Sequence, residues 1–207
     1  MDAGFLLGSQ LPETVYYPIH FADQDWKAPN RERYMVALAE HRPHMASVLD
    51  LEHESQLDEV LGWAEDAARF VQVVMIIPKA FGIIERLPRR IAGADVRLGY
   101  SVPTAFGGTE VPLWEFDGWP AHLLGGSPQA QMRLTRYLDV RSADGNYAQK
   151  MAVQYCQFWL PGTARYAKNR WWPTLLEANG ERMENDAPYE AFRRSCENIM
   201  QAWRNLF

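Results

Sequence analysis

The chain has 207 residues, of which 47% are hydrophobic and 13% aromatic, and its formal net charge is −5. These values indicate one globular domain, residues 1–207, and exclude a disordered chain. No apolar run approaches the roughly 20 residues of a membrane span, and the first residues lack the basic segment of a signal peptide. We therefore expect no membrane partner and a cytoplasmic location. The two cysteines, Cys156 and Cys196, exclude a disulfide framework and a four-cysteine zinc site.

The charge is unevenly distributed along the chain. Residues 1–100 carry 10 Lys and Arg against 15 Asp and Glu, whereas residues 126–175 carry 7 against 2. Rings and cations alternate over 155–172, which is typical of a platform that stacks nucleic-acid bases, although buried aromatic packing explains the pattern equally well. The residues that we expect to contact nucleic acid are Arg133, Arg141, Lys150, Lys168, Arg170 and Trp171.

Taken in order, short apolar runs alternate with helical patterns. We expect strands over 16–22, 45–49, 71–77 and 96–101, followed by two short strands that end near 124 and 141. Helical patterns cover 31–41, 56–69, a segment after Ser127-Pro128, 147–160 and 189–204, with a short helix or turn over 81–90. In the last helix the apolar stripe is predicted to be Tyr189, Phe192, Cys196, Ile199 and Trp203.

This alternation predicts an α/β protein with a parallel sheet. Both a doubly wound sheet and a barrel fit the pattern, and we favour a reduced or distorted (β/α) TIM-barrel-like fold over residues 1–146. Residues 147–207 then form a helical C-terminal extension that is basic and aromatic. In either architecture the functional site lies at the carboxyl ends of the strands.

Acidic residues follow three of the six predicted strands. They are Asp23 and Asp25, Asp50 and Glu52, and Asp144. Carboxylates that converge in an apolar cavity can act as nucleophile and as general acid or base, because repulsion and burial separate their pKa values. Asp and Asn also follow strands for a simpler reason, since they cap helices and form turns. Taken together, these acidic residues at three strand ends favour a functional role over capping and turn formation alone.

Other candidate substrate-binding residues at the strand ends are Lys79, Gly125, Gly126, Ser127, Ser142 and Asn146. The glycines allow a backbone to approach a ligand closely, and Lys79 has the chemistry for a Schiff base or a phosphate contact. His122 lies inside an apolar strand and is interpreted as a core histidine. No metal-ligand spacing such as His-x-x-x-His occurs, and we expect neither a metal nor a cofactor. The sequence also lacks Gly-x-Ser-x-Gly, P-loop and Gly-x-Gly-x-x-Gly motifs.

The segment His122-Leu123-Leu124-Gly125-Gly126, then a helix, then Asp139-Val140-Arg141-Ser142-Ala143-Asp144, resembles the late strands of tRNA-guanine transglycosylases. The run from Met45 to Glu52 is similar to the strand of that family whose terminal acidic residue grips the base. Viral relatives that insert 7-deazaguanines into DNA are nearest in theme. The family's Asp-Ser-Gly-Gly-Phe motif and Cys-x-Cys-x-x-Cys zinc site are absent from the sequence. In strict register the family's nucleophile position corresponds to Ser142, and Asp144 follows two residues later.

The resemblance implies an enzyme that cleaves a glycosidic bond or exchanges a base in nucleic acid. Asp144 would attack or stabilise C1′ of the sugar, and Asp23 or Asp25 would act as proton donor or acceptor. Asp50, Glu52 and the Gly125-Gly126 backbone would hold the base. The expected partners are nucleic acid, DNA rather than tRNA, and a free purine-like base. Two alternatives remain open: a lyase or aldolase-type barrel that uses Lys79, and a nonenzymatic binding protein of viral or mobile-element origin that docks a partner through Trp171-Trp172.

Overall fold

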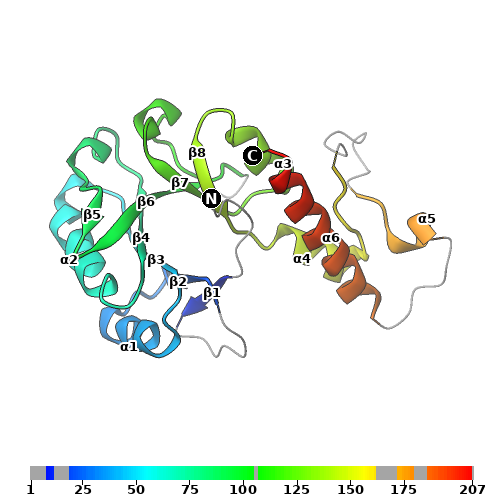
Figure 1. The fold of residues 1–207 in the computed structure, drawn as a ribbon, viewed down its shortest axis with the longest axis horizontal. Helices are drawn as coiled ribbons and strands as arrows, with labels where there is room; N and C mark the ends of the chain where they lie inside the picture. The colour runs from blue at the N-terminus through cyan, green and yellow to red at the C-terminus, as the bar shows by residue number, and fades with distance from the viewer. Residues whose placement is uncertain (1–7, 12–18, 105–106, 162–171, 180–185, 207) are drawn as a thin grey trace.

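The computed structural model of the chain describes residues 8–11, 19–104, 107–161, 172–179 and 186–206. Seven parallel strands form one sheet in the order β1-β2-β3-β4-β6-β7-β8, and β5 pairs antiparallel with β6. The strands are β1 (Gly8–Leu11), β2 (Phe21–Gln24), β3 (Met45–Leu51), β4 (Val73–Pro78), β5 (Arg90–Ile91), β6 (Ala94–Ser101), β7 (Pro120–Leu124) and β8 (Asp139–Ala143). Figure 1 shows this sheet curling into a half-barrel, which confirms the predicted reduced, barrel-like α/β fold.

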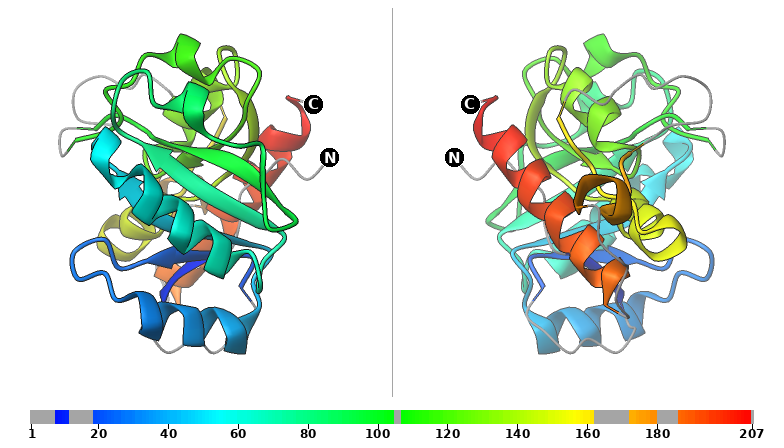
Figure 2. Two further views of the ribbon diagram at one scale, coloured as in Figure 1. Left: turned by 90° about the vertical axis from the view of Figure 1, so that its left-hand side faces the viewer. Right: turned by 90° about the vertical axis from the view of Figure 1, so that its right-hand side faces the viewer.

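Two helices lie on the convex side of the sheet (Figure 2, left). α1 (Arg31–His41) begins after Asn30, whose side chain accepts a hydrogen bond from the Arg33 N–H, and Arg42 ends it in a left-handed conformation with φ of 42°. α2 (Leu57–Ala67) follows the 3-10 turn η1 (Glu54–Gln56). Both helices bury apolar side chains against outward-facing residues of the strands.

The remaining connections in the half-barrel are shorter. In their described residues, the segments that precede β5 and β7 have as helical elements the 3-10 turns η2 (Ile84–Arg86) and η3 (Leu113–Phe116). α3 (Pro128–Leu134) joins β7 to β8, and Ser127 caps it by accepting a hydrogen bond from the Ala130 N–H at 3.3 Å. The barrel is thus reduced in its connecting helices as well as in its strands.

Successive strand residues face two different cores, as expected when both faces of a sheet are buried. Outward residues such as Val74 and Ile76 belong to the larger core beneath α1 and α2. The concave face carries a second, smaller apolar core made of Phe21, Met45, Val73, Met75 and Ile77. The ring of Phe21 on β2 lies 4.9 Å from that of His122 on β7, so the curl brings together strands that are far apart in the sheet.

An irregularity in β3 decides which side chains enter the concave space. The pairing of β3 with β4 shifts register between Ser47 and Asp50. Val48 and Leu49 both pack with the outer core, and so does Leu51. The shift therefore places Asp50, rather than Leu49, on the concave side after Ser47, as β-bulges commonly do beside functional sites.

The strand bounds correct the expected positions of two carboxylates. Asp23 and Asp50 were expected to follow their strands, but both lie within them, in β2 and β3. The predicted strand 16–22 is observed only from Phe21 onward, and residues 12–18 lie outside the described part of the chain. Sequence inspection also missed β1, the short β5 and the helix α5 (Leu175–Asn179).

The C-terminal part is helical, as predicted, but its details differ. α4 (Tyr147–Tyr155) ends five residues earlier than expected because Cys156 adopts a left-handed φ of 51°. α6 (Ala187–Arg204) packs against α4 (Figure 2, right).

The stripe predicted for α6 is wrong in part, since Tyr189 is 70% exposed. The buried face instead consists of Ala187, Ala191, Ser195, Ile199 and Trp203. Trp159 contributes to the position of α6: its backbone N–H donates to the Ser195 hydroxyl at 2.9 Å, and its carbonyl accepts from the Asn198 side chain at 2.7 Å. Within the described parts of the chain, no helix combines the length and apolar character needed to cross a membrane.

Candidate functional site

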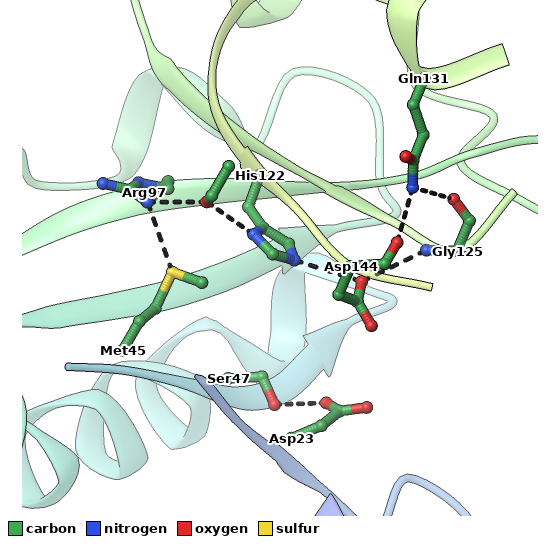
Figure 3. Close-up of polar contacts among 9 residues, drawn as sticks. Asp23, Met45, Ser47, Arg97, His122, Gly125, Gln131 and Asp144 are labelled. Atoms are coloured by element: carbon green, nitrogen blue, oxygen red, sulfur yellow. Dashed lines mark hydrogen bonds and ion pairs between the residues drawn. The ribbon is translucent and has the colours of Figure 1, made fainter. Parts of the chain in front are cut away.

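Three carboxylates converge at the carboxyl-terminal edge of the half-barrel, and we call Asp23, Asp50 and Asp144 the carboxylate cluster. They come from β2, from β3 and from the first residue after β8. The negative charges of Asp144 and Asp50 both act on Asp23 and favour its protonated form. Figure 3 shows Asp23 and Asp144 extending from opposite sides into the same space. The curl of the sheet accounts for this meeting, since β2 and β8 are not neighbours in the strand order.

Asp23 is set apart from the other two by its surroundings. Its burial raises its pKa from an ordinary value of 3.8 to about 6, and the charges of Asp144 and Asp50 act in the same direction. The Ser47 hydroxyl donates a hydrogen bond of 2.6 Å to the carboxylate and partly opposes the rise. Ser47 in turn accepts a 3.0 Å hydrogen bond from the Gln24 N–H, which fixes its orientation. A carboxyl group with a pKa near 6 is suited to take up and release protons at neutral pH.

Asp50 and Lys79 form a second polar contact at this edge. The Lys79 ammonium lies 3.7 Å from the Asp50 carboxylate and donates a 3.0 Å hydrogen bond to the Ser101 hydroxyl. Burial raises the pKa of Asp50, while the Lys79 charge lowers it and the Glu52 charge raises it. The side chains of Asp50 and Lys79 are 27% and 18% exposed, so both remain accessible to a ligand.

Asp144 is held by donors from β7 and its loop. Its Oδ1 atom lies 3.3 Å from the Gly125 N–H and 3.3 Å from His122 Nε2. Gln131, which is buried in α3, donates to the carbonyls of Gly125 at 2.8 Å and Asp144 at 2.6 Å (Figure 3). One amide group therefore ties together the two loops that present Asp144.

Beneath Asp144 lies a buried polar chain. His122 Nδ1 is 2.7 Å from the Ser142 hydroxyl, which also accepts a 2.8 Å hydrogen bond from the Arg97 guanidinium. His122 and Ser142 are both fully buried, whereas the Asp144 side chain is 29% exposed. Ser142 thus lies in the interior of the half-barrel, and Asp144 lies at its edge.

The glycines after β7 are required by the backbone. Gly125 and Gly126 have φ of 66° and 78°, a region that L side chains rarely adopt. At Gly126 a Cβ atom would also lie 2.5 Å from the Val102 side chain. The loop therefore passes close to its neighbours and presents the Gly125 N–H to Asp144.

Other predicted residues lie outside this cluster or have structural partners. Asp25 lies in the turn after β2, where its carboxylate accepts a hydrogen bond from the Lys27 N–H. Glu52 is exposed beyond β3, although its charge still acts on Asp50, and Asn146 is exposed at the start of α4.

The predicted nucleic-acid residues are only partly described. Arg133 and Lys150 are exposed on α3 and α4, and Arg141 pairs with Asp139 at 2.7 Å. Lys168, Arg170 and Trp171 lie outside the described residues. The neighbouring rings of Phe158, Trp159 and Trp172 are buried, so packing explains them.

Sequence reasoning missed three residues of the site. Arg97 stands among apolar residues of a strand, and a charged side chain in that setting was the available signal. His122 was interpreted as a core residue, which its burial confirms, but it also contacts Asp144. Gln131 gave no signal, because a glutamine in a helix is ordinarily exposed. In the described parts of the chain, no three His, Cys, Asp or Glu side chains lie close enough together to hold a metal ion.

The fold and the site together define a parallel β/α half-barrel with a carboxylate cluster at the carboxyl ends of its strands. The chain belongs to a family of unknown function, DUF6610, whose model matches residues 3–204. No curated protein and no solved structure matches the chain.

Proposed function

We propose that this protein cleaves or exchanges the glycosidic bond of a nucleoside unit in nucleic acid, with DNA as the favoured substrate and a guanine or 7-deazaguanine-type base as the exchanged group. The observation that carries the proposal is that two facing carboxylates, Asp23 and Asp144, have different surroundings. Asp23 has a pKa of about 6, whereas Asp144 accepts contacts from the Gly125 N–H and from His122. Glycosidic-bond chemistry uses such a pair, one group as acid and the other as nucleophile or charge stabiliser.

In the proposed reaction, an Asp144 oxygen forms a bond to C1′ of the sugar as the bond from C1′ to the base nitrogen breaks. The bonding electrons leave with the base, and protonated Asp23 supplies the proton that neutralises it. The Asp23 carboxylate then takes a proton from an incoming base or from water, which displaces Asp144 from C1′. In this proposal Asp50 and the Gly125-Gly126 backbone hold the edge of the base, and the likeness to transglycosylases supports this assignment.

The test is a base-release and base-exchange assay with purified protein. Duplex DNA, single-stranded DNA, tRNA and free nucleosides are each incubated with labelled guanine or a labelled 7-deazaguanine, and released and incorporated bases are measured by mass spectrometry. We expect activity in the wild type and a loss of about 100- to 10,000-fold in Asp144→Asn and Asp23→Asn. Asp95→Asn, an exposed carboxylate near the start of β6, is the matched control. Equal rates in all four proteins would refute the assigned roles.

A second candidate function rests on Lys79. Its ammonium group lies at the same edge, 3.7 Å from the Asp50 carboxylate and 3.0 Å from the Ser101 hydroxyl, and its side chain is 18% exposed. A lysine in this position could form a Schiff base with a carbonyl substrate, as in aldolase-type barrels. Borohydride reduction in the presence of candidate aldehydes or ketones, with Lys79→Arg as control, would then attach the substrate to Lys79. A protein that shows neither activity but captures a partner would favour the nonenzymatic alternative.

A further inference from the structure

The chain of contacts behind Asp144 joins four residues from neighbouring strands. Arg97 on β6 donates to Ser142 on β8 at 2.8 Å, Ser142 lies 2.7 Å from His122 Nδ1 on β7, and His122 Nε2 lies 3.3 Å from Asp144 Oδ1. His122 and Ser142 are directly paired across β7 and β8, and Asp144 follows Ser142 by two residues. The sheet itself therefore positions His122 and Ser142, and it is the most rigid support that the fold offers.

The donors and acceptors in this chain define where the protons lie. Arginine only donates, so the Ser142 oxygen accepts from Arg97. An ionised carboxylate only accepts, so the proton of the neutral His122 ring lies on Nε2, which donates it to Asp144. Nδ1 is then an acceptor, and the Ser142 hydroxyl donates to it. The opposite tautomer would direct a nitrogen lone pair at a carboxylate oxygen, which is repulsive.

The burial of these groups shows which end meets a substrate. Ser, His and Asp are also the residues of serine hydrolase triads, in which the serine is presented to the substrate and the aspartate is buried. Here the arrangement is reversed, since Ser142 and His122 are fully buried and Asp144 is 29% exposed. The complete burial of Ser142 keeps its hydroxyl away from a substrate, and the Arg97 hydrogen bond holds it in place.

We propose that Arg97, Ser142 and His122 act as a positioning relay, which fixes the Nε2-protonated tautomer of His122 and thereby aims the Asp144 carboxylate at the substrate. Asp144, and not Ser142, is then the group that reacts. The catalytic part of this inference rests on the proposed function, whereas the tautomer and the inertness of Ser142 do not. The reacting group then lies two residues after Ser142, the position that the strict register of the resemblance gives for the nucleophile.

The first experiment reads the tautomer directly. Nitrogen-15 NMR of the labelled protein at pH 7, with His122 assigned by difference from His122→Gln, should show the neutral ring protonated on Nε2. Ser142→Ala should weaken this preference, because only Asp144 then favours Nε2, and Ser142→Thr, which keeps the hydroxyl, should restore it. A wild-type ring that is protonated on Nδ1, or on both nitrogens, would overturn the relay whatever the enzymatic activity.

The second experiment uses a fluorophosphonate probe, which labels nucleophilic serines. Wild-type protein should remain unlabelled at Ser142, and labelling that is lost in Ser142→Ala would overturn the inference.

The third experiment tests the link to Asp144 with two variants of His122. Gln places an amide N–H near the position of Nε2 and should keep within about tenfold of the wild-type kcat. Asn reaches only the position of Nδ1 and should lower kcat at least a hundredfold with little change in KM. Circular dichroism spectra confirm that both variants fold. If both variants match the wild type, the relay has no positioning role; if the wild type has no base-exchange activity, only the proposed function fails.

Discussion

The raised pKa of Asp23 makes a specific prediction about stability. A carboxyl group whose pKa is 3.8 in the unfolded chain and about 6 in the folded protein favours folding when protonated. This stabilisation is fully present below about pH 3.8 and is lost as the pH rises through 6. A shift of about two pKa units corresponds to about 3 kcal/mol, because each unit is about 1.4 kcal/mol. Asp23→Asn keeps an oxygen for the Ser47 hydroxyl but carries no charge at any pH.

The assay is urea unfolding of wild type and Asp23→Asn at several pH values between 3.5 and 7.5. We expect the stability of the variant relative to wild type to increase by about 3 kcal/mol from the acid to the neutral end. Asp95→Asn, whose side chain is 70% exposed, serves as the control and should follow the wild type. If the difference between Asp23→Asn and wild type does not change with pH, Asp23 does not titrate in this range and the proposed acid role is lost with it.

Three further predictions concern the support of the site. Gly99→Ala should lower stability by about 1–3 kcal/mol, because the added Cβ atom would lie 2.7 Å from the Ile77 side chain. Its control in the same urea assay is Gly62→Ala in α2, which should be neutral or stabilising. Gln131→Ala should cost about 1–3 kcal/mol by leaving two loop carbonyls without their donor, and hydrogen exchange should quicken in both loops. Ser47→Ala removes the hydrogen bond that lowers the pKa of Asp23, so carbon-13 NMR of that carboxyl should report a titration above that of the wild type.

The elements that the sequence predicts well are those with a strong local pattern. The bounds predicted for α1 match the observed helix, and the apolar run of β4 is buried throughout, because helix caps and hydrophobic periodicity are local properties. Strand-end logic also placed Asp23, Asp50 and Asp144 at one edge, and the structure brings them together. The same logic included Asp25 and Glu52, which lie outside the cluster, and it expected Asp23 and Asp50 after their strands instead of within them.

What the sequence did not predict depends on distant contacts. The relay joins Arg97 to residues 25 and 45 positions away, and no spacing rule connects them before the strand order is known. Gln131 looks like an ordinary helical residue until the two loops that it joins are seen. In α6 the small residues Ala191 and Ser195 face inward, and Tyr189 does not. Small side chains on this face allow the helix to pack close to its neighbours.

The register shift in β3 has a consequence for comparing members of this family. Because two successive residues, Val48 and Leu49, face outward, simple alternation fails at this point of the strand. A relative that lacked one residue here would keep an unbroken strand, and an ungapped alignment from the start of β3 would then align its acidic residue with Leu49. The acid that corresponds to Asp50 should therefore be identified by its pairing opposite Ile77 on β4, and not by its distance in sequence from the start of β3.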